Sequence, residues 1–184
     1  MSERLPTRRE ALNLLLKAGC SERVVKHCKA VSAFATKIAR ACQKKGHNVN
    51  IQLVEIGALL HDMGRSKTHK VDHAWMGSEI ARSLGLPKSV ALIIERHAGG
   101  GIPSEEARQL GLPVRDYLPQ TLEEKIVCYA DKRVEGTRTV SVEQTIKVYA
   151  ASLGEKHPAI ERIRQLHHEI STLIGNLGAD CEAS

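Results

Sequence analysis

The chain has 184 residues and carries 27 Lys and Arg against 21 Asp and Glu, a net charge of +6. This length suits one domain with a real core and is too short for two comfortable ones. The positive charge favours anionic ligands such as nucleotides and phosphate esters. One Phe, one Trp and three Tyr leave few aromatic platforms for single-stranded bases, so the composition disfavours a nucleic-acid partner.

Five cysteines stand at positions 20, 28, 42, 128 and 181, an odd number without a Cys-x-x-Cys pair. We therefore expect neither disulfides nor a thiolate zinc site. The N-terminal segment is charged and then amphipathic, unlike a signal peptide, and no apolar run is long enough to cross a membrane. These features predict a soluble, cytoplasmic protein, whose oligomeric state the sequence does not indicate.

Apolar residues recur at helical spacing along nearly the whole chain, and the β-branched clusters typical of a sheet are missing. This pattern predicts one all-α domain over residues 1–184, without a linker. The expected helices, in chain order, cover about 7–18, 21–45, 50–61, 73–84, the stretch "SVALIIERHAGGG", 104–111, 121–134, 141–153 and 158–177. Ser21 is expected to cap the second helix, and Thr121 with Glu124 and Ser141 with Gln144 to form capping boxes.

Several polar residues fall on or beside apolar helix faces, where an unpaired charge is costly. His61 and Asp62 follow directly on "IGALL", and Asp131 shares a helix face with Val127 and Val134. Imidazole and carboxylate groups are ligands that divalent transition metals accept at open catalytic sites, and helices can deliver them to one centre. The pattern predicts a metal site built from His27, His61, Asp62, His73, His97 and Asp131.

The surroundings of these residues are, in chain order, "VVKHCKAV", "LLHDMGRSKTH", "VDHAWMG", "IIERHAGG" and "YADKRVEGTR". They resemble the HD superfamily of metal-dependent phosphohydrolases, in the subset with two extra histidines and a dinuclear metal centre. The resemblance covers about residues 21–138 and implies an HD-domain helical bundle, followed by further helices over about 141–177. It is nearest to YqeK-like and unassigned HDIG proteins, although "HDMG" has Met where the HDIG motif has Ile. The GYP motif of the HD-GYP group is absent.

This resemblance implies the distribution of the ligands over two divalent ions. The first ion would bind His27, His61, Asp62 and Asp131, and the second would bind His73, His97 and the bridging Asp62. His69 is a rival for His73, because spacing alone does not separate them, although "HAWMG" matches the family at His73. The ligand types leave the metal open among Fe, Mn, Ni, Co and Zn.

The reaction implied by the resemblance is hydrolysis of a phosphate ester or phosphoanhydride of a nucleotide or similar small molecule. A water between the two ions would attack phosphorus, and Asp62 would be the central catalytic residue because it bridges them. Arg65, one turn beyond Asp62, is the first candidate to bind the substrate's phosphate. Further candidates are Lys67, Lys132, Arg133 and Arg138.

Two other functions remain open at this point. Some relatives with the same six ligands are di-iron oxygenases, and a metal can also stabilise a non-catalytic module. The remaining histidines match no family position and are predicted to lie on the surface, at positions 47, 157, 167 and 168.

Overall fold

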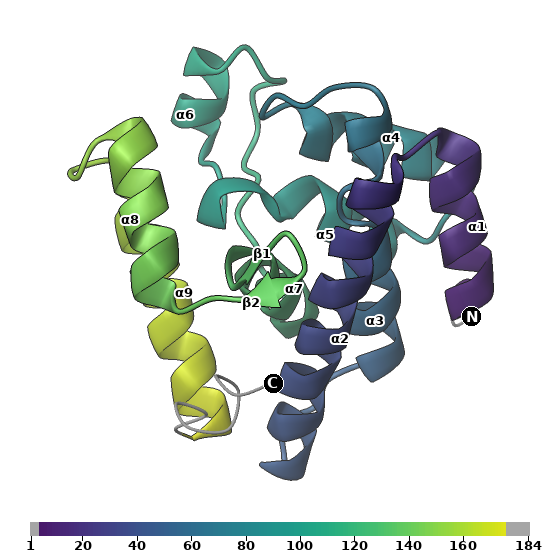
Figure 1. Cartoon of the computed structure of the whole chain (residues 1–184), viewed down its shortest axis with the longest axis horizontal. Coiled ribbons are helices and arrows are strands. Elements are labelled where there is room, and N and C mark those ends of the chain that lie inside the picture. Colours follow the sequence, from purple (N-terminus) through teal and green to yellow (C-terminus); the bar gives the residue numbers. More distant parts are fainter. Residues whose placement is uncertain (1–3, 176–184) are drawn as a thin grey trace.

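The computed structural model describes residues 4–175 and is almost entirely helical (Figure 1). The prediction of an all-α fold is confirmed. Its α-helices are α1 (Arg8–Ala18), α2 (Glu22–Lys44), α3 (Ile51–Leu60), α4 (His73–Ser83), α5 (Lys88–Arg96), α6 (Ser104–Gln109), α7 (Leu122–Lys132), α8 (Val142–Leu153) and α9 (Pro158–Ile174). Two short 3-10 helices, η1 (Met63–Ser66) and η2 (Ala98–Gly100), follow α3 and α5.

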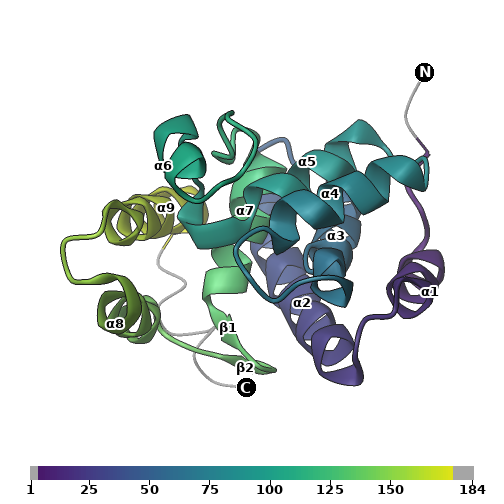
Figure 2. The ribbon, with the colours of Figure 1, turned by 90° about the horizontal axis from the view of Figure 1, so that it is seen from above.

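Helix α3 lies at the centre of the domain, where it packs against α1, α2, α5 and α7 (Figure 2). Its sequence is apolar on several faces, and six of its ten residues are buried. The long helix α2 turns a stripe of buried residues toward it, including Val31, Ala35 and Ile38. Burial of these side chains drives the bundle together, and it places the end of α3 inside the protein.

The helix starts follow the predicted caps in most details. Ser21 accepts a hydrogen bond from the Val24 backbone at the start of α2, and Ser141 with Gln144 forms a complete capping box at α8. At the start of α7, the Thr121 side chain accepts a hydrogen bond from the Glu124 backbone. The Glu124 carboxylate, however, accepts from Gln120 N and from Arg96 rather than from the Thr121 backbone, so the capping box predicted for Thr121 and Glu124 is only half formed.

A small β-hairpin joins α7 to α8, and the sequence patterns did not predict it. Its strands, β1 (Val134–Glu135) and β2 (Arg138–Thr139), pair antiparallel around a turn in which Gly136 has φ 61°. Strands of two residues are too short to produce a visible alternation of apolar and polar side chains. The hairpin redirects the chain after α7, so that α8 and α9 lie at the end of the domain opposite α1 (Figure 1).

The other sequence expectations concern cysteines and membranes. The described cysteines, Cys20, Cys28, Cys42 and Cys128, are free and buried, and Cys181 lies outside the described residues. Within residues 4–175, no helix combines the length and the apolar character that crossing a membrane requires.

Candidate metal centre

Six side chains from five helices or helix ends meet in the interior of the domain. His27 comes from α2, and His61 and Asp62 come directly after the last residue of α3. The other members are His73 at the start of α4, His97 directly after α5, and Asp131 in the last turn of α7. The structure therefore brings together all six residues that the sequence nominated as metal ligands.

Close backbone packing makes this convergence possible. At Gly64, in η1, an added Cβ would lie 1.9 Å from the carbonyl oxygen of His73 and 2.6 Å from the Gly77 nitrogen. Only glycine lets the chain after Asp62 pass so near the start of α4. This contact holds the end of α3 against the helix that carries His73.

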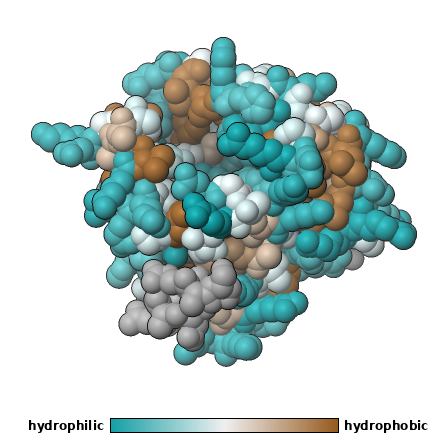
Figure 3. Space-filling model, in the orientation of Figure 1, coloured by the Kyte–Doolittle hydropathy of each residue, from teal (hydrophilic) through white to brown (hydrophobic). Residues whose placement is uncertain are grey.

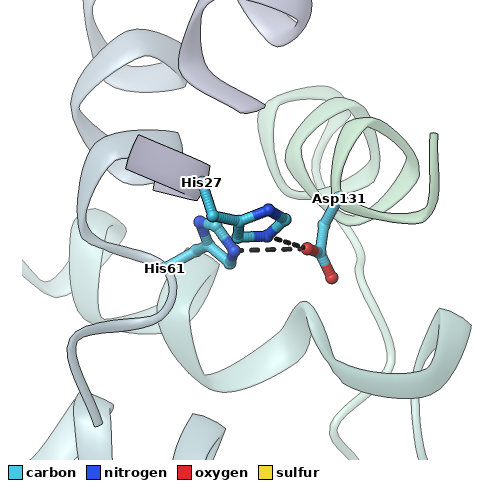
Figure 4. A group of neighbouring side chains, drawn as sticks. All are labelled: His27, His61 and Asp131. Atoms are coloured by element: carbon cyan, nitrogen blue, oxygen red, sulfur yellow. Dashed lines mark hydrogen bonds and ion pairs between the residues drawn. The ribbon is translucent and has the colours of Figure 1, made fainter. Parts of the chain in front are cut away.

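One group of side chains surrounds the Asp131 carboxylate. The Nε2 atom of His27 lies 3.0 Å from Asp131 Oδ1, and the Nε2 atom of His61 lies 3.3 Å from the same oxygen. Figure 4 shows both imidazole rings directing a nitrogen toward this oxygen. His27, His61 and Asp131 form a set of ligand atoms close enough to hold one metal ion.

Asp62 lies between this group and a second pair of histidines. Its Oδ2 atom is 4.0 Å from His27 Nε2 and 3.8 Å from His61 Nε2. Its Oδ1 atom is 3.2 Å from His73 Nε2 and 3.5 Å from His97 Nε2. One carboxylate thus turns each of its oxygens toward a different pair of histidines, which is the arrangement of a bridging ligand.

In each of the four cluster histidines, the Nδ1 atom, on the side of the ring away from the carboxylates, is hydrogen-bonded to a backbone carbonyl. The Nδ1 atoms of His61, His73 and His97 each lie 2.7 Å from a carbonyl oxygen three residues earlier in the chain. In His27, Nδ1 lies 2.9 Å from the carbonyl oxygen of Gly136 in the β-hairpin. Because a carbonyl only accepts, Nδ1 donates, and each Nε2 lone pair is left to face the centre of the cluster.

The cluster fits divalent metal ions by its donor set and by its unsatisfied atoms. Among the described residues, His61 Nε2 and Asp62 Oδ1 are buried without a hydrogen-bond partner. Unpaired buried polar atoms are costly, and few occur in native proteins unless an ion or water satisfies them. Four imidazoles and two carboxylates suit first-row transition metals, and the two orphaned atoms are ones that metal ions would engage.

Electrostatics keep the two carboxylates ionised. Burial raises the pKa of Asp62, but His61 and the other histidines outweigh it and hold this pKa well below its usual range. Burial likewise raises the pKa of Asp131, and Lys132 with the histidines lowers it well below normal. Both groups are therefore in the charged form that binds cations.

The histidines differ in their protonation. Burial lowers the pKa of His97 to about 4, so this ring is neutral and ready to bind metal at pH 7. Burial also lowers the pKa of His61, but the Asp62 carboxylate overrides it and raises this pKa well above normal. A metal ion bound to His61 Nε2 would have to displace the proton that this shift favours.

Two basic side chains border the cluster. Arg65 Nε donates to Asp62 Oδ2 at 2.9 Å, and its Nη1 donates to the His69 carbonyl at 3.2 Å. The Lys132 ammonium donates to Asp131 Oδ2 and is buried, with 8% of the residue exposed. Both residues line a pocket of about 510 Å³ that reaches His73, His97 and Asp131.

The other three predicted phosphate-binding residues do not line this pocket. Arg133 is buried beside the Phe34 and Tyr129 rings, and it donates to Tyr129 Oη and to the Val140 carbonyl. Lys67 and Arg138 are exposed. Lys132 and Arg133 are adjacent, but successive residues at a helix end project in different directions, so only Lys132 reaches the pocket.

The remaining histidines fall in several environments. His69, the rival of His73 as a ligand, is exposed and lines the pocket. His73 belongs to the cluster, with its Nε2 atom 3.2 Å from Asp62 Oδ1. His157, predicted to lie on the surface, caps α9 through its Nδ1 atom and also lines the pocket. His167 is half-buried and hydrogen-bonded to Tyr129 Oη, so the surface prediction is wrong for this residue. A Pro directly after His157 was the available sign of a helix cap there.

Comparison with known proteins identifies a family, similar sequences and a similar structure. Residues 24–134 match the family described as "HD domain". The chain is 51% identical over 160 residues to the uncharacterized protein MJ0778 of Methanocaldococcus jannaschii, covering 87% of this chain and 95% of that one. The structure also matches the HD domain of the L. monocytogenes phosphodiesterase PgpH in complex with cyclic-di-AMP, with a TM-score of 0.52, 19% identity and 91% and 97% coverage.

Other relatives are larger proteins. The tRNA (cytidine(56)-2'-O)-methyltransferase of Thermoplasma volcanium is 41% identical over 171 residues, 93% of this chain and 48% of the methyltransferase. Ribonuclease Y of Chloroflexus aurantiacus is 30% identical over 142 residues, 76% of this chain and 24% of the ribonuclease. The chain therefore spans half or less of the length of these two relatives.

Proposed function

This chain belongs to the HD domain family, a family of metal-dependent phosphohydrolases, and we propose that it hydrolyses a phosphate ester or phosphoanhydride bond of a nucleotide or similar small molecule. The observation that carries the proposal is the position of Asp62. Its two oxygens face two different histidine pairs, 3.2–4.0 Å away. This geometry supports a dinuclear centre, the arrangement that phosphoryl-transfer sites use to stabilise an in-line displacement.

The proposed ligands divide as the geometry suggests. His27, His61 and Asp131 would hold one divalent ion, His73 and His97 the other, and Asp62 both. When bound, the ions would supply positive charge for the phosphoryl oxygens and lower the pKa of water toward neutrality. The protein's own contribution is to fix each imidazole through its Nδ1 contact, since outer contacts of this kind typically alter metal affinity or activity by about 10–100-fold.

Arg65 and Lys132 are the proposed contacts of the substrate phosphate. Two of the three guanidinium nitrogens of Arg65 are engaged by Asp62 and the His69 carbonyl, which leaves Nη2 for a phosphate oxygen. Lys132 already binds Asp131 Oδ2, so its ammonium both positions that carboxylate and adds positive charge at the pocket. Both groups strengthen the attraction for an anionic substrate.

Water is the proposed nucleophile. Among the described residues that line the pocket there is no serine or cysteine, and Thr145 is the one aliphatic hydroxyl. Thr145 donates to the Lys132 carbonyl instead of pointing a free hydroxyl at the cluster. A covalent phosphoenzyme through a side chain is therefore not part of the proposal.

The proposal is tested with protein that has been stripped of metal and reloaded separately with Mn²⁺, Fe²⁺, Co²⁺, Ni²⁺ or Zn²⁺. Candidate substrates are cyclic-di-AMP, which the fold neighbour's structure contains, diadenosine tetraphosphate and chromogenic phosphate esters. We expect hydrolysis that depends on metal and disappears in Asp62→Ala. Absence of hydrolysis across this panel with two ions bound would reject the proposal.

RNA is a second candidate substrate, because two sequence relatives are named for action on RNA. The similarity to the methyltransferase covers 93% of this chain, and that to Ribonuclease Y covers 76%. The same cluster would then cleave a phosphodiester of a polynucleotide. End-labelled RNA oligomers in the metal-reloaded assay distinguish the two candidates, since a small-molecule enzyme would leave them intact.

A further inference from the structure

The pocket beside the cluster has a second side, formed by residues outside the family match. Its 510 Å³ exceeds what a phosphate group fills and lies in the range of small-molecule sites. Helix α8 contributes Thr145, Val148, Tyr149 and Leu153 to the lining, and all four lie beyond residue 134, where the HD domain match ends. The pocket therefore joins a family centre to a side built mainly from α8, to which Leu110 at the end of α6 also contributes.

The side chain of Thr145 orients α8 toward the cluster. Its hydroxyl donates to the carbonyl of Lys132, the residue after Asp131. Tyr149 and Leu153 follow Thr145 at intervals of four residues, so the three side chains lie along one face of the helix. The face that carries Tyr149 is thus turned toward the end of α7 from which Asp131 projects.

Half of the large apolar residues that are exposed within the described chain line this pocket. Six large apolar residues within residues 4–175 are exposed, and three of them line the pocket: Leu110 at 44%, Val148 at 59% and Leu153 at 47%. Figure 3 shows hydrophobic patches on the side of α6 and α8, and a further one on the opposite side near α1, on a largely hydrophilic face. Apolar side chains gathered at one opening indicate a binding surface more than chance exposure does.

Tyr149 differs from the other two tyrosines in having no evident structural task. The hydroxyl of Tyr117 donates to the Pro113 carbonyl, and that of Tyr129 is bound to His167 and Arg133. Tyr149 is half-buried at the pocket, and its hydroxyl has no hydrogen bond to another described residue. Gln109, which lines the same pocket, is exposed, and its amide likewise has no hydrogen bond to another described residue.

We infer that Leu110, Val148, Tyr149 and Leu153, here named the apolar wall, bind the planar base of a nucleotide substrate whose phosphate lies at the cluster. The inference rests on the proposed function and adds the substrate class. A base has two apolar faces and a polar edge, which match the Tyr149 ring with its aliphatic neighbours and the Gln109 amide. Arg65, Lys70 and Lys132 line the same pocket and supply the charge for the phosphate.

Two chromogenic esters test the inference in the metal-loaded, full-length protein. Thymidine 5′-(p-nitrophenyl) phosphate carries a base, and methyl p-nitrophenyl phosphate has the same leaving group without one. We expect Tyr149→Ala to raise KM for the thymidine ester by about 10-fold with kcat little changed, since one stacked base contributes on that order. The methyl ester should be unaffected, and Tyr149→Phe should behave like the parent protein.

The possible outcomes separate this inference from the proposed function. Unchanged KM for the thymidine ester in Tyr149→Ala, with hydrolysis intact, overturns the inference alone. If the parent protein hydrolyses neither ester, binding of thymidine 5′-monophosphate is measured by calorimetric titration. Binding that Tyr149→Ala weakens about 10-fold would support base binding by the apolar wall, and absence of binding would reject it. A dimer that dissociates in Leu153→Ser, with nucleotide binding independent of Tyr149, would assign the wall to a second copy and also overturn the inference.

Discussion

The histidine–aspartate cluster and the apolar wall line one pocket but are built in opposite ways. In the cluster the polar groups are largely buried, and each histidine has its Nδ1 atom on a backbone carbonyl. In the wall, Leu110, Val148 and Leu153 are exposed, and the Tyr149 hydroxyl has no hydrogen bond to another described residue. The difference teaches that reactive groups are fixed by the fold, whereas the surface proposed to select the substrate can change without disturbing it.

The largest effect is expected when the cluster loses its shared carboxylate. Asp62→Ala should abolish binding of at least one metal ion and lower the hydrolysis rate by more than the ~100-fold that loss of an outer contact can cause. Elemental analysis and the rate with a reloaded metal measure both. Asp116→Ala, at an exposed carboxylate bonded to Ser104 N, is the control. Retention of both metal and rate in Asp62→Ala would contradict a bridging role.

A matched histidine pair tests the second metal. His73→Ala should remove about one ion per chain and reduce the rate by at least ~10-fold, because His73 Nε2 faces Asp62 Oδ1 at 3.2 Å. His69→Ala, four residues earlier at an exposed position, should leave the metal content unchanged. Loss of an ion in His69→Ala but not in His73→Ala would show that His69, and not His73, is the metal ligand.

An effect on stability is expected at the close approach that holds the cluster together. Gly64→Ala places a methyl group 1.9 Å from the His73 carbonyl oxygen, so the backbone must shift. We expect the free energy of unfolding to fall by at least ~1–3 kcal/mol, as in overpacked cores, measured by urea denaturation. Gly111→Asn is the control, because nothing lies near that position and Asn tolerates its φ of 72°. Equal stability of the two variants would show that η1 is free to move.

The smallest effect is expected at the apolar wall. Leu153→Ser should change the free energy of unfolding by no more than ~0.5 kcal/mol and leave the metal content intact, because Leu153 is 47% exposed. Leu84→Ser, at a residue 50% exposed outside the pocket, provides the comparison in thermal melts. A clear loss of stability in Leu153→Ser but not in Leu84→Ser would show that the apolar wall contributes to the core. The contrast between a fixed cluster and a replaceable wall would then fail.

Much of the fold and the composition of the cluster could be predicted from the sequence. Helical periodicity is sustained along the chain, and caps such as Ser21 and Ser141 mark where helices begin. His61 and Asp62 stand out because they interrupt an apolar helix end, where a charge needs compensation. The short β-hairpin was missed, since two-residue strands leave no pattern.

Side-chain direction was harder to predict than side-chain identity. Lys132 and Arg133 are adjacent basic residues, yet one lies at the pocket and the other packs beside Phe34 and Tyr129. Periodicity places a residue on a helix face only where the helix's neighbours are known. The apolar wall was not predicted at all, because Val148 and Leu153 look like ordinary core residues until the packing of α8 is seen.

The backbone contacts of the four histidines also bear on the order in which the centre assembles. His61, His73 and His97 are each oriented by a carbonyl three residues away, so a helix end alone suffices to set the ring. His27 obtains its orientation from Gly136, 109 positions along the chain. Contacts between distant residues close late because loop entropy opposes them. Three of the four imidazoles are therefore oriented locally, whereas His27 is oriented only when the hairpin has docked.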